Sequence, residues 1–126
     1  PKGIGLFNWF MQQEGEIKGY TKAMWTGQTT LQLAKTMEVA AKEKACGLYN
    51  TVPDCSISKY DLLRLFNEYV KKDKLIIHPV EGINADKSLK RTRYAFSYQI
   101  PDYEHMVKDM AEWIFTHKEM YPHYHL

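Results

Sequence analysis

Residues 19–35 read Gly19-Tyr-Thr-Lys-Ala-Met-Trp-Thr-Gly-Gln-Thr-Thr-Leu-Gln-Leu-Ala-Lys35, a stretch that joins an extended, aromatic segment to the start of a helix. The Thr29 hydroxyl can accept a hydrogen bond from the third helical amide, and Gln32 can reach back, which is a capping-box pattern. The stretch predicts an extended segment over 16–25 and a helix that begins at Thr29 and stops near Gly47. One side of that helix is apolar and consists of Leu33, Ala34, Met37 and Ala41.

Helices and strands alternate along the rest of the chain. A helix is expected over 3–13, and short strands are expected at 48–52, at 75–77 (closed by Pro79) and over 93–100. Ser58 to Asp61 begins another capped helix, whose apolar side contains Leu62, Leu65, Phe66 and Tyr69. Pro101-Asp102 opens the last helix, in which a core-packing stripe contains Met106, Met110, Trp113 and Ile114. The pattern predicts one α/β unit over 1–126, with helices packed on a few short strands.

Composition excludes several classes of protein. A chain of 126 residues is long enough for one core but too short for a cofactor domain plus a substrate domain. The formal charge is only +2, with acidic and basic residues interspersed, so nucleic acid is not an expected partner. No apolar run approaches the ~20 residues that span a bilayer. Cys46 and Cys55 are expected to be reduced thiols of a cytoplasmic protein.

The chain lacks the sequence patterns of reductase chemistry. A short-chain reductase needs a tyrosine followed four residues later by a lysine that lowers the pKa of the phenol. Here the residue four positions after Tyr60 is Arg64, and no other tyrosine is followed by a lysine at that offset. Gly3-Ile-Gly5-Leu-Phe-Asn8 imitates a dinucleotide loop, but no strand precedes it and its last position is Asn. The histidines of 117–125 lack firm partners for zinc. We therefore expect no catalytic, cofactor-binding or metal-binding residue in this chain.

Several segments, taken in order, resemble the C-terminal half of the extended short-chain dehydrogenase/reductase superfamily, in its dTDP-4-dehydrorhamnose reductase-like branch. The order of the matches is more specific than any one of them. Gly5 to Phe10 resembles the helix after the sixth strand of that branch, and Gly19 to Lys35 resembles its strand-turn-helix ending in Thr-x-x-Leu-Ala-Lys/Arg. Gly47 to Asn50 resembles its Gly-x-Tyr/Phe-His/Asn strand. Ser56 to Leu63 resembles its Ser-x-Tyr/Phe-Asp/Glu helix start, and Asp86 to Leu89 resembles its Ser-x-Leu motif.

The resemblance implies that the chain is the C-terminal, sugar-nucleotide-binding domain of an NAD(P)-dependent reductase acting on a nucleotide-linked 4-keto deoxy sugar. The N-terminal Rossmann half, which would bind NAD(P)H and carry the catalytic residues, is absent from residues 1–126 and is an expected partner. The segment itself would bind no cofactor and would be inactive alone. Expected substrate contacts are Lys22, Trp25, Thr26 and Gln28 in the turn, and Lys87, Ser88 and Arg91 in a later loop.

Alternatives remain open at the level of sequence. Where the rhamnose-pathway reductases carry Gln-x-Gly-x-Pro-Thr, this chain has Ala23-Met-Trp-Thr-Gly-Gln28. The sugar is therefore undetermined, and part of a sugar-nucleotide epimerase or dehydratase is an alternative. A non-catalytic regulatory binding module of the same fold is another. A half-domain that packs on a Rossmann sheet would expose apolar surface, so self-association is also expected.

Overall fold

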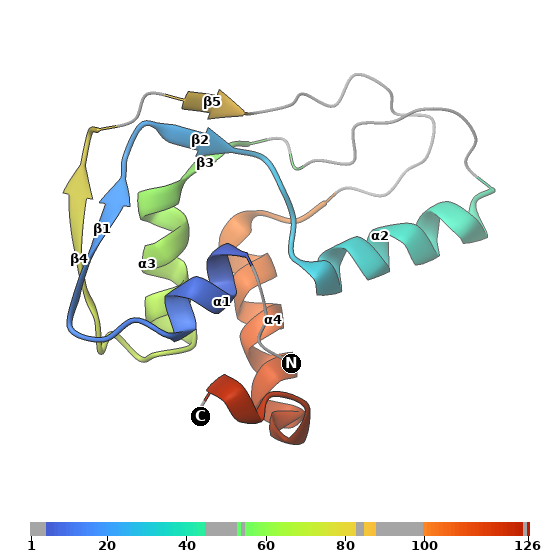
Figure 1. Ribbon diagram of the computed structural model, residues 1–126. Helices are drawn as coiled ribbons and strands as arrows, with labels where there is room; N and C mark the ends of the chain where they lie inside the picture. The colour runs from blue at the N-terminus through green and yellow to red at the C-terminus, as the bar shows by residue number, and fades with distance from the viewer. Residues whose placement is uncertain (1–4, 45–52, 54, 83–84, 88–99, 125) are drawn as a thin grey trace.

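The computed structural model describes residues 5–44, 53, 55–82, 85–87, 100–124 and 126 (Figure 1). The helices are α1 (Leu6–Met11), α2 (Thr30–Lys42), α3 (Lys59–Tyr69) and α4 (Tyr103–Thr116), followed by the 3-10 turns η1 (Lys118–Met120) and η2 (Pro122–Tyr124). The strands are β1 (Glu16–Tyr20), β2 (Ala23–Trp25), β3 (Ile57–Ser58), β4 (Ile76–Val80) and β5 (Ala85–Lys87). The predicted α/β class, helices on a few short strands, is confirmed.

The strands form two small sheets. β1 and β4 pair in parallel, whereas β2 pairs antiparallel with β3 on one side and parallel with β5 on the other. The predicted extended segment over 16–25 is therefore two strands, which separate at a turn where the Thr21 amide donates to the Val80 carbonyl (2.9 Å). The prediction that Pro79 closes its strand was wrong. Pro79 lies within β4 opposite Gly19, and a two-stranded sheet has edges where a missing N–H is tolerated.

The core lies where α3 contacts α1, α4 and the strands. Leu62 and Phe66 are each only 5% exposed, which confirms the apolar side predicted for this helix. The ring of Phe7 meets that of Phe66 edge-on, with centroids 5.0 Å apart. Asn67 joins α3 to β4, because its side-chain amide donates to the Leu75 carbonyl (2.8 Å) and accepts from the Leu75 amide (3.1 Å).

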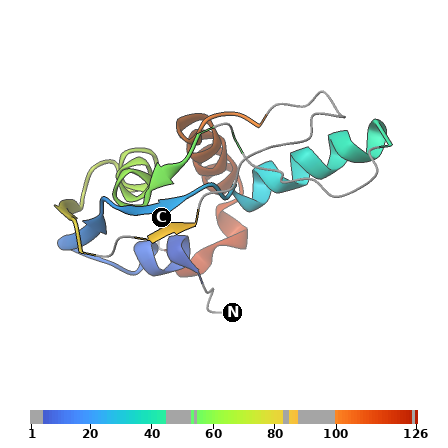
Figure 2. The same cartoon turned by 90° about the horizontal axis from the view of Figure 1, so that it is seen from above.

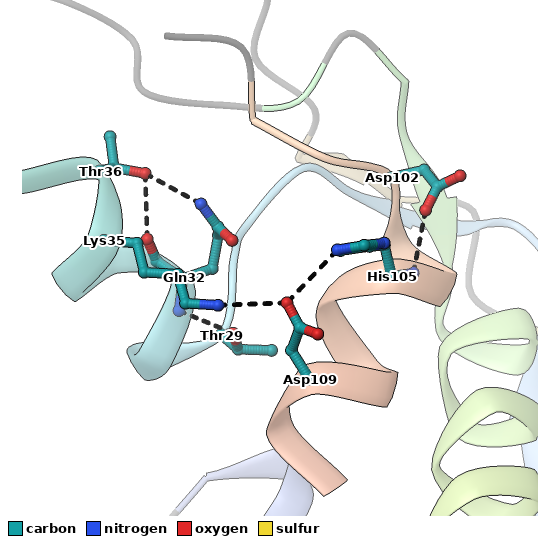
Figure 3. Close-up of polar contacts among 7 residues, drawn as sticks. All are labelled: Thr29, Gln32, Lys35, Thr36, Asp102, His105 and Asp109. Carbon is teal, nitrogen blue, oxygen red and sulfur yellow. Dashed lines mark hydrogen bonds and ion pairs between the residues drawn. The ribbon is translucent and has the colours of Figure 1, made fainter. Parts of the chain in front are cut away.

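The helix starts follow the predicted caps. Thr29 Oγ1 accepts from the amide of Gln32 (3.1 Å), and Asp102 Oδ1 accepts from the amide of His105 (2.9 Å), as Figure 3 shows. Ser58 Oγ caps α3 in the same way. These bonds satisfy backbone donors that no helical carbonyl can reach, which is why the helices begin at these residues.

The predicted apolar face of α2, and one residue of the predicted α4 stripe, are not buried. On α2, Leu33 is 40% and Met37 is 63% exposed, whereas the polar Gln32 and Thr36 are almost fully buried. Figures 1 and 2 show α2 extending away from the α3–α4 pair, so its packing is set by the path of the chain and not by its apolar stripe. Trp113 was predicted to be in the core, but it lies near the end of α4 and is 41% exposed. Met106 and Ile114 are buried as predicted.

Several expectations fall outside the described residues. These are the strand at 48–52, the extended segment before Ile100, and the loop residues Ser88 and Arg91. In the described part of the chain, no helix is both long enough and apolar enough to cross a membrane. Within the same residues, no three His, Cys, Asp or Glu side chains gather into a group that could hold a metal ion.

Candidate functional site

A pocket of about 870 Å³ lies between β2, the helix starts and the C-terminal end of the chain. Its lining is mostly apolar and aromatic, with a few polar groups, as is usual for small-molecule sites. Segments far apart in sequence supply it, because α1, the residues between β2 and α2, the start of α3, and α4 all contribute. The aromatic residues among those that line it are Phe7, Tyr20, Trp25, Phe66, Tyr103, Trp113, Tyr121 and Tyr124.

Tyr103 positions one wall of the pocket. Its buried hydroxyl donates to the Gly27 carbonyl (2.9 Å) and also lies 3.4 Å from the Trp25 carbonyl oxygen. This contact attaches the first residue of α4 to the segment that leads from β2 into α2. Burial raises the pKa of the Tyr103 phenol, so the hydroxyl keeps its proton at an alkaline pH at which an exposed tyrosine would release it.

Gly27 allows the Trp25 side chain to fold back over the backbone. A Cβ placed on Gly27 would sit 1.6 Å from Trp25 Cζ2, so the indole could not keep this position over a larger residue. The indole ring is tilted by 36° against the Tyr103 ring, with centroids 6.1 Å apart. With 37% of Trp25 still exposed, part of its surface is accessible to a ligand.

A buried polar group connects the pocket to the interior of α2 (Figure 3). Thr36 Oγ1 donates to the Gln32 carbonyl oxygen (3.0 Å), lies 3.2 Å from Gln28 Oε1, and accepts from Gln32 Nε2 (3.4 Å). The Gln32 Nε2 group is thus directed towards Thr36, and the Thr29 half of the predicted capping box forms. These bonds restrain the Gln28 side chain, which lines the pocket.

One ion pair joins α2 to α4 beside the pocket, and its carboxylate also contacts a histidine of α4. Lys35 Nζ lies 3.2 Å from Asp109 Oδ2, and His105 Nε2 lies 3.5 Å from the same oxygen. Figure 3 shows both side chains converging on Asp109 from opposite sides. The Lys35–Asp109 pair links the two helices, whereas His105 and Asp109 are one turn apart within α4. Both contacts are at least partly exposed, so their contribution to stability is small.

The structure brings together some of the predicted substrate contacts. Trp25 and Gln28 line the pocket, and Thr26, between them, is 4% exposed and does not. Lys87 belongs to β5, where its Cα is in register with that of Trp25, so the predicted turn and the predicted loop are neighbours in one sheet. Lys22 lies outside the pocket, in the turn between β1 and β2, where it pairs with Glu81 (3.6 Å).

Sequence reasoning missed other residues of the pocket. Lys59 is the only Lys, Arg, His, Asp or Glu among the described residues that line it. Trp113, Tyr121 and Tyr124 also line it, although no substrate contact was predicted among the C-terminal residues. The available signal was the density of aromatic residues between 113 and 124, which is unusual for a solvated segment.

Solved structures of known proteins share this fold. A dTDP-4-dehydrorhamnose reductase from Bacillus anthracis, crystallised with NADP, superposes with a TM-score of 0.66 over 85% of this chain at 14% identity. One from Clostridium acetobutylicum gives a TM-score of 0.64 over 90% of the chain, also at 14% identity. This chain has the fold of part of these reductases. It spans only 42% and 45% of their respective lengths.

A third structure belongs to a different enzyme. A UDP-N-acetylglucosamine 4-epimerase from Methanobrevibacter ruminantium, in complex with UDP-N-acetylmuramic acid, matches 89% of this chain with a TM-score of 0.59 and 15% identity. The chain spans 39% of that epimerase. No protein-family model and no curated protein matches the sequence. The fold is therefore shared by a reductase and an epimerase that both resemble this chain.

Proposed function

We propose that the chain is the substrate-binding portion of an NAD(P)-dependent reductase that acts on a nucleotide-linked 4-keto deoxy sugar. The observation that carries the proposal is that segment 19–35, one of the five segments that carry the resemblance, forms one wall of the pocket through Trp25 and Gln28. The shared fold with two dTDP-4-dehydrorhamnose reductases supports it. A second portion would bind NAD(P)H and be the partner that delivers hydride; one of those reductases was crystallised with NADP.

The chemistry of the pocket suits a ligand with rings at its ends and negative charge between them. Aromatic side chains offer flat apolar faces to a base and a sugar. Lys59 and the start of α2 offer positive charge to a diphosphate, because Thr29, Thr30 and Leu31 line the pocket and the first turn of α2 carries no acidic residue. The proposed contacts Trp25 and Gln28 in the pocket, with Lys87, Ser88 and Arg91 from the neighbouring segment, would orient the sugar. Holding reactants in place can lower a barrier by up to about 7–11 kcal/mol.

A sugar-nucleotide epimerase is the second candidate, because the chain has the same fold as part of the M. ruminantium enzyme. The two candidates differ in the nucleotide and the sugar that the pocket would accept. A ligand panel therefore distinguishes them more directly than a test of activity, which would need the partner portion.

Tryptophan fluorescence provides the test. Trp25 and Trp113 line the pocket whereas Trp9 does not, so Trp9→Phe removes background signal. The purified chain is titrated with dTDP-rhamnose, dTDP, UDP-N-acetylglucosamine and NADPH, and circular dichroism verifies that it is folded. Saturable quenching by dTDP-rhamnose, without a response to NADPH, is the expected result. Preference for UDP-N-acetylglucosamine would favour the epimerase, and silence towards all nucleotide sugars from a folded chain would refute the proposal.

A charge variant tests how the ligand is held. Lys59→Gln is expected to weaken dTDP-rhamnose binding roughly ten-fold at low salt, since hydrogen bonds to charged groups contribute about 1.5–3 kcal/mol. Lys108→Gln is the matched control, because it removes the same charge from an exposed position on α4 that does not line the pocket. Equal affinities of the two variants would show that Lys59 does not contact the diphosphate.

A further inference from the structure

The C-terminal end of the chain folds back onto its N-terminal helix. Neither η1 nor η2 contains a buried residue, yet Tyr121 and Tyr124 beside and within them are half-buried. The Tyr124 hydroxyl donates to Asn8 Oδ1 (2.7 Å), and its ring meets the Phe7 ring edge-on with centroids 5.4 Å apart. A residue of the last turn is thus held against α1 from 116 positions away.

Three side chains from this end form an aromatic wall of the pocket: Trp113, Tyr121 and Tyr124. The Tyr121 and Tyr124 rings are nearly parallel, with 4° between their planes and centroids 5.4 Å apart. Trp113 Nε1 donates to the Tyr121 hydroxyl oxygen (3.2 Å). Because that oxygen acts as the acceptor, the Tyr121 proton can still be donated to a ligand.

The aromatic wall suits one part of a nucleotide sugar better than the others. None of the three side chains is cationic. Lys59 is the first residue of α3, and Figure 1 shows that this end of α3, beside β3, lies away from the C-terminal turns. A diphosphate would therefore bind elsewhere in the pocket. A sugar needs several polar partners for its hydroxyls, whereas the wall offers ring faces and one hydroxyl donor. A pyrimidine base has a flat π-face and carbonyl acceptors that match both features.

We propose that the aromatic wall is the subsite for the pyrimidine base of the ligand, and that Tyr121 is a specificity-determining residue. The inference rests on the proposed function, because it assigns a part of the nucleotide sugar to a part of the same pocket. Stacking of a base on an aromatic side chain is worth roughly 5- to 150-fold in affinity when the ring is removed. The base would then be recognised by the C-terminal turns, and the charged part of the ligand by Lys59.

Two ligands separate the base from the rest of the molecule. Thymidine and dTDP-rhamnose are titrated into the Trp9→Phe chain and into three variants of it. Tyr121→Ala is expected to weaken both ligands by the same factor, about ten-fold or more. Tyr121→Phe, which keeps the ring, is expected to weaken both only a few-fold. Lys59→Gln is expected to weaken dTDP-rhamnose but not thymidine.

Controls keep a structural defect apart from a lost contact. Phe115→Ala removes an aromatic ring from α4 outside the pocket and is expected to leave both affinities unchanged. In the unaltered chain, thymidine is expected to shift the ring-proton NMR signals of Tyr121 and Tyr124, a measurement that needs no variant.

The outcomes distinguish this inference from the proposed function. Binding of dTDP-rhamnose with no loss in Tyr121→Ala, or without thymidine-dependent shifts at the aromatic wall, would refute the base subsite and leave the proposed function standing. Binding of neither ligand to the folded chain would refute the proposed function, and the base subsite with it.

Discussion

Removing one hydroxyl group, by Tyr103→Phe, is expected to loosen the attachment of α4 to the pocket. The hydroxyl is buried and donates to the Gly27 carbonyl (2.9 Å). Phenylalanine fills nearly the same volume, so the loss is that of the hydrogen bond plus the desolvation of a carbonyl left without its donor. That combination costs about 1–3 kcal/mol. For a chain of this length, about 2 kcal/mol corresponds to a fall of about 8 °C in the melting temperature.

The same variant is expected to change the response to alkaline pH. Burial raises the pKa of Tyr103 in the folded state. Above pH ~10 the unfolded phenol releases its proton while the folded one keeps it, so the unfolded state binds fewer protons and stability falls as pH rises. This stabilising contribution is complete below pH ~10 and is lost as pH approaches the folded pKa. Phenylalanine cannot titrate, so the decline in Tyr103→Phe should be shallower by up to about 1.4 kcal/mol per pH unit. Tyr69, whose pKa is raised to about 12 by its hydrogen bond to Glu104, remains in both proteins.

Urea unfolding at pH 7 and at intervals from pH 9 to 11 measures both effects. Tyr60→Phe is the matched control, because no hydrogen bond of the Tyr60 hydroxyl occurs among the described residues. It is expected to change the free energy of unfolding by less than about 0.5 kcal/mol. If Tyr103→Phe were as stable as the unaltered chain at pH 7, the hydroxyl would not attach α4 to Gly27. An unchanged alkaline slope would show that Tyr103 titrates alike in both states.

Three further substitutions test how the pocket is supported. Asn67→Ala leaves the Leu75 amide and carbonyl without partners and is expected to cost about 2–4 kcal/mol in urea unfolding; a cost below 1 would contradict the contact. Asp102→Ala removes the cap of α4 and is expected to cost about 1 kcal/mol, whereas Asp102→Asn should restore most of it; equal losses would point to charge and not to capping. Gly19→Ala places a Cβ 2.9 Å from the backbone Cα of Tyr60, so overpacking of α3 on β1 should lower the melting temperature, and an unchanged midpoint would show that the helix can shift.

Local chemistry made much of the fold predictable. The hydroxyl or carboxylate of Thr29, Ser58 and Asp102 accepts from an amide in the first turn, and each helix begins beside its cap. Leu62 and Phe66 recur at helical spacing and are buried, because α3 is surrounded by other elements. The resemblance located one wall of the pocket at Trp25 and Gln28, since the two belong to one continuous segment.

Contacts between distant segments decided the rest. A periodic apolar stripe cannot show whether another element covers it, and on α2 Leu33 and Met37 are exposed while Thr36 is buried. Nor can spacing show that Tyr124 reaches Asn8 across almost the whole chain, which is why the C-terminal wall of the pocket was missed. The sequence by itself determined where the helices begin and which segment carries the resemblance, because capping and periodicity act within a few residues. Only the tertiary structure decided which faces are buried and which aromatic side chains enclose the pocket, because both depend on the path of the backbone between elements.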